Sequence, residues 1–267
     1  MQIKNNWITG FVDAENCFAI QKIMLQNNKF SITHKFSVSI DKRSVDVLYA
    51  LKRKFKCGNV YKSNADMYEF CVTDKKSFIK SIIPFFIKYP LQTLKRKNFY
   101  KFVESINVDV NNVLYKDFYN VQNENFIFNL NDDWVAGFLD AEACFHISIV
   151  DNYPQPKIFV QVNEKDLNLL QHLKNYLKCG HITIRENFHM FTVYSTKHLL
   201  QFIFPKLYTK SNKNLLKTIK RINFQKFKKI VFHISEKKHL TVAGMEKIEK
   251  LKKTMCLCTH LCLQINC

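Results

Sequence analysis

The chain has 267 residues, and its 41 Lys and Arg against 22 Asp and Glu give a formal net charge of +19. Because 47% of the residues are hydrophobic and 14% are aromatic, the composition excludes a disordered polycation and allows one large domain or two smaller ones. No apolar run reaches the roughly 18 residues of a membrane span, and the first residues lack the apolar core of a signal peptide.

The positive charge is spread along the chain, which favours nucleic acid over an anionic membrane surface as the partner, so we expect no membrane association. Nine Cys residues at irregular spacings argue against a closed disulfide framework and favour a reducing compartment. Only five of the 41 cationic residues are Arg, and Asn, Ile and Phe are abundant, which is typical of an AT-rich organellar gene.

Hydrophobic periodicity and turn residues predict two successive sets of elements. The first set is a helix over 7–15, strands near 18–26 and 30–40, a helix over 45–55, strands near 59–63 and 67–73, and helices around 75–87 and 91–106. The second set is a helix over 132–142, strands 145–150 and 157–163, a helix over 165–178, strands 181–186 and 189–195, and helices 197–204 and 213–229. Gly58 is expected at C′ of the helix over 45–55, and Thr241 as the N-cap of a further helix over 242–254.

The two sets are copies of one unit. Residues 7–18 recur as 134–145 with eight of 12 positions identical, 56–58 recur as 178–180, and 91–102 recur as 216–227. A duplicated unit of about 100 residues has the size of a compact domain. We therefore expect a first repeat over 1–107, a linker over 108–130, a second repeat with a C-terminal helix over 131–254, and a Cys-rich tail over 255–267.

The first helix of each copy carries small residues one turn apart. Gly10 and Ala14 stand at i and i+4, and Gly137 and Ala141 repeat this spacing. Small residues at this spacing let two helix backbones approach closely. We expect the two helices to pack on each other around a pseudo-twofold axis.

An acidic residue ends each of these helices. Glu15 and Glu142 would then lie close together near the axis. Adjacent carboxylates repel each other unless a cation lies between them, and oxygen ligands suit Mg²⁺. The alternative is that Asp13 and Glu15 are polar residues at a helix end with no chemical role.

Strand periodicity separates two faces of each sheet. Residues expected to face the helices are Phe30, Ile32, His34, Phe36, Val38 and Ile40 in the first copy, and Ile158, Val160 and Val162 in the second. Residues expected to face outward are Ser31, Thr33, Lys35, Ser37, Ser39, Lys157, Phe159, Gln161, His181, Thr183 and Arg185. Small hydroxyls, amides and cations on one face suit contact with base edges and phosphates, whereas the alternative is an ordinary solvated face.

The repeated segments carry a resemblance to a known family. Gly10-Phe11-Val12-Asp13-Ala14-Glu15 and its copy Gly137-Phe138-Leu139-Asp140-Ala141-Glu142 resemble the LAGLIDADG motif of homing endonucleases, and two motifs in one chain resemble the single-chain, pseudo-dimeric branch. The resemblance covers about residues 5–254. It implies an α+β fold of two pseudo-symmetric αββαββα repeats, whose saddle-shaped antiparallel sheets form a DNA-binding surface. The final Gly of the motif is replaced here by Asn16 and Ala143.

The resemblance also implies a metal site. Glu15 and Glu142 match the acidic position that binds Mg²⁺ and is essential for cleavage. Ala14 and Ala141, the preceding residues, belong to the same metal site, which is expected to hold two or more divalent ions between the motif carboxylates.

Further polar residues complete the implied active site. Lys95 and Lys220 match a basic position beside the scissile phosphates, where they would act as catalytic residues. Asn163, with Asp41 as its partner in the first copy, matches a polar position that often follows the second strand.

These residues imply a site-specific homing endonuclease that acts as a monomer and makes a Mg²⁺-dependent double-strand break. Its target would be a double-stranded site of roughly 20 base pairs, read through the major groove. Such proteins are encoded within organellar introns, so a mitochondrial origin is expected, with the chloroplast as the alternative.

Other functions stay open at this stage. The main alternative is a maturase that binds intron RNA and assists splicing on the same scaffold, and a third is a DNA-binding regulator. Cys256, Cys258, His260, Cys262 and Cys267 crowd the C-terminus, but their spacing does not match a paired Cys zinc site.

Overall fold

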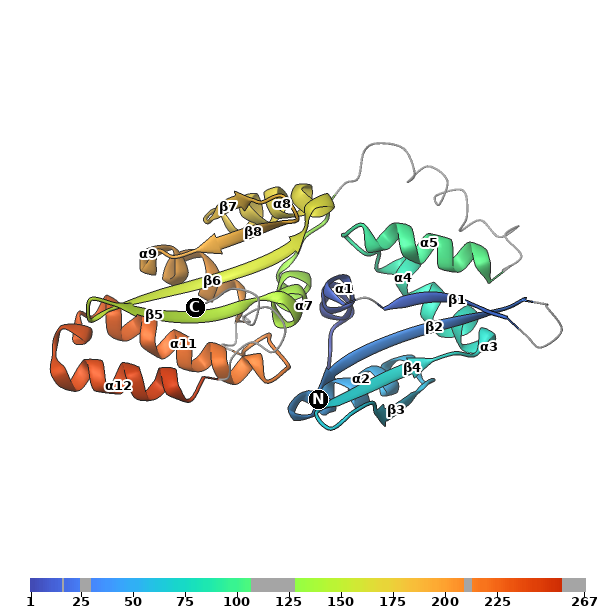
Figure 1. The fold of residues 1–267 in the computed structure, drawn as a ribbon, viewed down its shortest axis with the longest axis horizontal. Helices are drawn as coiled ribbons and strands as arrows, with labels where there is room; N and C mark the ends of the chain where they lie inside the picture. The colour runs from blue at the N-terminus through green and yellow to red at the C-terminus, as the bar shows by residue number, and fades with distance from the viewer. Residues whose placement is uncertain (16, 25–29, 107–127, 209–212, 256–267) are drawn as a thin grey trace. The chain divides into compact units, whose positions relative to one another are not determined.

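A computed structural model describes residues 1–15, 17–24, 30–106, 128–208 and 213–255 (Figure 1). The chain divides into two compact units, Met1–Phe138 and Leu139–Cys267. The boundary therefore falls inside helix α7 (Asp132–Glu142), whose first part belongs to the first unit. Most of the expected linker over 108–130 and nearly all of the Cys-rich tail over 255–267 lie outside the described residues.

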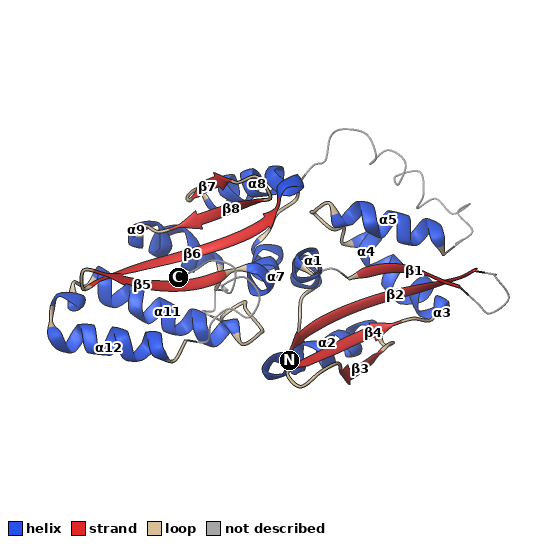
Figure 2. Cartoon of the chain, in the orientation of Figure 1, coloured by secondary structure: helices blue, strands red, loops and turns tan. Residues whose placement is uncertain are grey.

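The first unit contains one sheet and a set of helices on one of its faces (Figure 2). The strands pair antiparallel in the order β1-β2-β4-β3. The elements are α1 (Asn5–Ala14), β1 (Phe18–Met24), β2 (Phe30–Asp41), the 3₁₀ turn η1 (Lys42–Ser44), α2 (Val45–Phe55), β3 (Asn59–Lys62), β4 (Met67–Val72), α3 (Lys75–Ser77), the π-helical turn η2 (Phe78–Ile82), α4 (Ile83–Lys88) and α5 (Lys95–Ser105).

Aromatic side chains build the core of this unit. Phe36 of β2 is fully buried, and its ring centroid lies 5.7 Å from that of Phe86. Phe18 of β1 lies 5.1 Å from Phe99 and 5.2 Å from Phe102, both on α5. Helices α4 and α5 therefore pack against the inner face of the sheet, over the first residues of β1 and the middle of β2.

The other half of the hairpin formed by β1 and β2 differs from the expected pattern. Phe30 and Ile32 are each 56% exposed, so the prediction that they face covering helices is wrong for these two positions. His34 marks the limit of the covered region, since its Nε2 lies 2.8 Å from Oγ of Ser105 at the end of α5. Toward the turn between β1 and β2, the large apolar side chains Ile32, Phe30 and Met24 are exposed.

The second unit repeats the architecture. Its strands pair antiparallel in the order β5-β6-β8-β7. The elements after α7 are β5 (Cys144–Val150), β6 (Tyr153–Asn163), η4 (Glu164–Asp166), α8 (Leu167–Leu177), β7 (His181–Ile184), β8 (Phe188–Val193), α9 (Thr196–His198), the π-helical turn η5 (Leu199–Ile203), α10 (Phe204–Lys206), α11 (Lys220–Ser235), η6 (Lys238–Leu240) and α12 (Val242–Lys253). As predicted, Thr241 caps α12, because its Oγ1 accepts a hydrogen bond of 3.1 Å from the Gly244 N–H.

Two local expectations are corrected by backbone geometry. Lys56, not Gly58, is the left-handed residue that ends α2, with φ 54°, and Gly58 lies two residues later with φ 74°. β6 begins at Tyr153 rather than at 157, because Asp151 and Asn152 both have positive φ and form a two-residue hairpin turn.

The described residues contain neither a membrane-spanning helix nor a disulfide bond. Within them, no helix is long and apolar enough to cross a membrane. The five described cysteines, Cys17, Cys57, Cys71, Cys144 and Cys179, are all free thiols.

Candidate active site in each repeat

The motif helix α1 meets the first part of α7 at its glycines. A Cβ placed on Gly10 would lie 2.0 Å from the carbonyl oxygen of Trp134. A Cβ on Gly137 would lie 2.1 Å from the carbonyl oxygen of Trp7. No side chain fits at such distances, so both positions require Gly for the two helix backbones to make this contact.

The first acidic residue of the motif in α1 has a structural role that sequence reasoning missed. Asp13 is 2% exposed and accepts four hydrogen bonds. They come from the backbone N–H of Gln92 (2.7 Å) and Thr93 (3.0 Å), the Thr93 hydroxyl (2.7 Å) and Nε1 of Trp134 (2.9 Å). Burial raises the pKa of Asp13 to about 6, and these donors oppose a further rise.

These hydrogen bonds position a lysine beside the end of α1. The Thr93 hydroxyl that donates to Asp13 also accepts a hydrogen bond of 3.2 Å from the N–H of Lys95. Lys95 is the first residue of α5, and its Nζ donates to the carbonyl oxygen of Ala14. The ammonium group is therefore held next to the residue that precedes Glu15. We call Asp13, Thr93 and Lys95 the first Asp–Thr–Lys network.

The second unit contains the same arrangement. Asp140 is 1% exposed and accepts hydrogen bonds from the N–H of Lys217 and from the N–H (3.1 Å) and hydroxyl of Thr218. The Thr218 hydroxyl accepts a hydrogen bond of 3.1 Å from the N–H of Lys220, whose Nζ donates to the carbonyl oxygen of Ala141. Burial raises the pKa of Asp140 as well. Asp140, Thr218 and Lys220 form the second Asp–Thr–Lys network.

The last helix of each repeat begins later than expected, just after the residues that bind the two networks. The predicted starts were 91 and 213, whereas α5 begins at Lys95 and α11 at Lys220. In each repeat, a buried carboxylate binds the N–H groups of two residues just before the helix.

The motif glutamates follow directly on these networks. Glu15 is the C-cap of α1, with an extended backbone (φ −91°, ψ 157°). Glu142 is the last residue of α7. Both are half-buried, each one residue after the carbonyl that receives the lysine Nζ. The expected proximity of the two carboxylates stays a prediction.

Each repeat supplies a donor set that fits a hard divalent cation. A carboxylate (Glu15 or Glu142) and a backbone carbonyl (Ala14 or Ala141) offer only oxygen atoms, which Mg²⁺ prefers. Among the described residues, no group of three His, Cys, Asp or Glu side chains could hold a metal ion alone. Such an ion would therefore need further ligands, as Mg²⁺ normally takes from water and phosphate oxygens.

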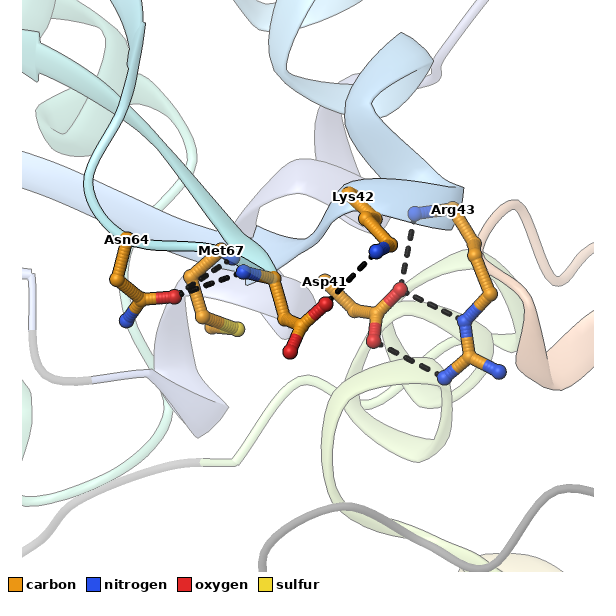
Figure 3. A network of polar contacts seen from close by, with 6 residues as sticks. Asp41, Lys42, Arg43, Asn64 and Met67 are labelled. Carbon is orange, nitrogen blue, oxygen red and sulfur yellow. Dashed lines mark hydrogen bonds and ion pairs between the residues drawn. The ribbon is translucent and has the colours of Figure 1, made fainter.

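Asp41 and Asn163 occupy equivalent positions and act as caps. Asp41 accepts hydrogen bonds from the N–H of Arg43 (2.9 Å) and from its guanidinium, which lowers the pKa of Asp41 (Figure 3). Asn163 accepts a hydrogen bond of 3.1 Å from the N–H of Lys165. Their side chains thus cap η1 and η4, and their role as polar residues of the active site stays a prediction.

The strand register brings another polar residue, Gln161 of β6, opposite the position of Glu142. Cys144 of β5 pairs with Phe159 of β6. Because the pair is antiparallel, Glu142, two residues before Cys144, corresponds to Gln161, two residues after Phe159. The corresponding position of the first repeat is Ser39.

Most of the outward-facing residues lie on the expected face of their sheets. Ser37 pairs with Cys71 and Ser39 with Glu69, opposite to the core face that holds Phe36 and Val38. Ser31, Thr33, Lys35, Ser37, Ser39, Lys157, Gln161, His181 and Thr183 are exposed or half-buried on that face, and Arg185 is exposed just after β7 ends.

Phe159 is the exception. It pairs with Cys144 and Thr192 and therefore shares their face, but it is only 4% exposed. Phe159 thus lies on the same face as Lys157 and Gln161, as expected, but it is covered, and the residues it pairs with are 2% and 1% exposed. The Lys157 ammonium lies 5.5 Å from the centroid of its ring.

A further polar cluster on the outward face of the first sheet was missed. Glu69 of β4 receives the ammonium of Lys35 (2.6 Å) and the hydroxyl of Tyr61. The alternation of Tyr68, Phe70 and Val72 in the sequence could have placed Glu69 on the outward face, since alternate residues of a strand share a face.

Comparisons with known proteins agree with this geometry. The model of the LAGLIDADG endonuclease family matches residues 8–106 and 135–231. "Probable intron-encoded endonuclease 2" of Neurospora crassa is 25% identical over 94% of this chain and 64% of its own length. "Probable intron-encoded endonuclease Cox1-I1b" of Schizosaccharomyces pombe is 26% identical over 59% of this chain and 48% of its own length. The chain thus matches only about half to two thirds of these relatives.

Solved structures extend the likeness to the fold. The I-LtrWI LAGLIDADG homing endonuclease bound to target DNA has a TM-score of 0.83 and 26% identity, covering 94% of this chain and 97% of that one. The I-SmaMI homing endonuclease bound to cleaved DNA has a TM-score of 0.82 and 22% identity, covering 96% and 97%. With both repeats matched by the family model and the whole two-unit fold shared, this chain belongs to the LAGLIDADG endonuclease family.

Proposed function

We propose that this chain is a homing endonuclease that hydrolyses both strands of a long, specific DNA site. The observation that carries the proposal is the duplicated Asp–Thr–Lys network. In each repeat it places a lysine ammonium at the carbonyl that precedes the motif glutamate. A lysine ammonium bound to the carbonyl next to a glutamate, twice in one chain, is suited to cutting each strand of a duplex once.

The roles of the residues follow from their charges. Lys95 and Lys220 would stabilise negative charge as it develops on the phosphate oxygens during hydrolysis. Glu15 and Glu142, with the carbonyls of Ala14 and Ala141, would hold Mg²⁺. When bound, the ion lowers the pKa of a coordinated water and polarises the phosphate. Asp13 and Asp140 touch no reacting atom and act as positioning residues for the two lysines.

The outward faces of the sheets would read the DNA sequence through the major groove. Lys22, Lys35, Lys62 and Lys157 are the only cationic residues within the eight described strands. The sheets are therefore better suited to base contacts than to phosphate contacts. The salt-dependent phosphate contacts would come mainly from lysines on helices and loops.

The gene is proposed to lie within a mitochondrial intron. The protein would act as a monomer on a DNA site of roughly 20 base pairs. Support comes from relatives that are named as intron-encoded endonucleases and from one named "Uncharacterized mitochondrial protein RF1" in Saccharomyces cerevisiae. One I-SmaMI structure with an uncleaved DNA target contains calcium ions, in line with a divalent cofactor here.

The test uses DNA that spans the intronless insertion site, with Mg²⁺ present. The unmodified protein should produce a double-strand break, and Glu15→Gln and Glu142→Gln should each abolish the break. Glu249→Gln, an exposed residue of α12 outside the repeated segments, serves as a matched control and should cut normally. Absence of cleavage by the unmodified protein, together with stimulated splicing of the intron RNA, would replace this proposal with the maturase.

A further inference from the structure

Three side chains from adjacent strands meet on the outward face of the first sheet. Lys35 lies on β2, Glu69 on β4 and Tyr61 on β3, and the register pairs Glu69 with Tyr61. The Lys35 ammonium lies 2.6 Å from one carboxylate oxygen of Glu69, and the Tyr61 hydroxyl donates to the other. We call these three residues the Lys–Glu–Tyr cluster.

The contacts of Glu69 favour its charged form. Glu69 is 8% exposed, and although this burial opposes ionisation, hydrogen bonds from Lys35, Tyr61 and Ser37 lower the pKa of Glu69. The hydrogen bond to Glu69 raises the pKa of Tyr61, so the phenol stays protonated as a donor. A half-buried ion pair of this kind is only weakly screened by salt.

The cluster still has hydrogen-bonding capacity to offer. The Lys35 ammonium has three N–H donors and gives one of them to Glu69. The two carboxylate oxygens can together accept about four hydrogen bonds, of which Lys35, Tyr61 and Ser37 supply three. Within the major groove, a G·C pair presents the O6 and N7 acceptors of guanine beside the N4 donor of cytosine. A lysine and a glutamate fixed next to each other match this pattern, with Lys35 facing the guanine and Glu69 the cytosine.

The equivalent positions of the second sheet are chemically different. The rows Ser39–Glu69–Tyr61 and Gln161–Met190–Thr183 correspond by strand register. Met190 therefore replaces the acid, and none of the four strands of that sheet, all within the described residues, contains Asp or Glu. Lys157, the counterpart of Lys35, lies over the ring of Phe159 instead.

Resting on the proposed function, we infer that the Lys–Glu–Tyr cluster selects a G·C base pair in the half-site bound by the first repeat. The second repeat has no such selectivity at its corresponding base pair. There, Met190 offers apolar contact, which suits the methyl group of thymine. The target would thus be asymmetric at this position, although the two repeats share one fold.

The test is selection of double-stranded DNA from a randomised library by binding, without a divalent ion, so that it does not depend on cleavage. The unmodified protein should enrich a G·C pair at one position of one half-site. Glu69→Gln keeps the size of the side chain but removes its charge. It should reduce that preference about fivefold or more, the low end of what one good base contact provides.

A second variant and a control sharpen the result. Glu69→Met installs the residue of the second repeat and should shift the preference at this position toward A·T or T·A. The control is Lys42→Met, which removes one partner of the exposed 2.8 Å Lys42–Asp66 ion pair in the same unit (Figure 3). It should leave the selected sequence unchanged.

The outcomes are distinguishable. An enriched sequence that both Glu69 variants leave unchanged would overturn this inference and leave the endonuclease proposal standing. If the Glu69 variants bind every base-pair position less selectively to the same extent, with no change in the selected sequence, the inference is also overturned. That result would indicate a structural role for Glu69. No enriched sequence with the unmodified protein would overturn the inference together with the specific DNA binding on which the proposed function depends.

Discussion

Replacing Thr93 by Val tests whether the first Asp–Thr–Lys network positions Lys95. The two side chains have the same shape, but Val lacks the hydroxyl that donates to Asp13 (2.7 Å) and accepts from the N–H of Lys95 (3.2 Å). Thr93 is 6% exposed, so water cannot readily replace these hydrogen bonds.

The magnitude follows from the two lost contacts. A hydrogen bond to a charged acceptor is worth about 1.5–3 kcal/mol, and a buried N–H left without a partner costs about 1–3 kcal/mol. Because Asp13 keeps three other donors, we expect the free energy of unfolding to fall by about 2–4 kcal/mol. Displacement of the Lys95 ammonium should slow cleavage of one strand about tenfold or more.

Two assays separate these effects. Urea unfolding measures stability, with an unchanged m-value showing that the folded state stays compact. A supercoiled plasmid carrying the target reports the two cuts separately, because a cut in one strand gives the nicked form and cuts in both give the linear form. Thr93→Val should accumulate the nicked form. Thr218→Val should do the same through a cut in the opposite strand.

Thr254→Val, an exposed position after α12, is the control and should change neither measurement. The reasoning is refuted if Thr93→Val alters the unfolding free energy by less than about 0.5 kcal/mol, the range of an ordinary surface substitution. It is also refuted if both strands are cut more slowly to the same extent, since the second network is intact in this variant.

Two further predictions concern the buried part of the motif helices. Gly10→Ala should destabilise the protein by about 1–3 kcal/mol or more, because its Cβ would lie 2.0 Å from a backbone carbonyl that cannot move aside, and an unchanged urea midpoint would contradict this contact. The pKa of Asp13 is raised from 3.8 to about 6, so between these pH values the native state holds a proton that the unfolded state has released. The contribution of Asp13 to the unfolding free energy should therefore decrease by up to about 3 kcal/mol as the pH rises from 4 to 6. Subtracting the pH profile of Asp13→Asn isolates this decrease, and parallel profiles would show that Asp13 does not titrate there.

Local sequence patterns predicted most of the fold. The helices over 45–55 and 132–142 have the bounds of α2 and α7. Four strands in each repeat lie close to the predicted positions. The starts of α5 and α11 were misplaced, and the residues just before these helices bind Asp13 and Asp140, nearly 80 residues away in the sequence. No pattern within a short window contains that information.

The sequence by itself determined the duplication, the positions of Gly10 and Gly137, and the candidate residues Glu15, Glu142, Lys95 and Lys220. The duplication, the two Gly positions and the two Glu positions follow from identity between two segments of one chain and from small residues spaced four apart. The roles of Lys95 and Lys220 come from the resemblance to the LAGLIDADG family. Only the tertiary structure decided how each lysine is held and that Glu69 joins Lys35 on the outward face. Such side-chain partnerships depend on strand register and on contacts between distant segments, which hydrophobic periodicity alone does not encode.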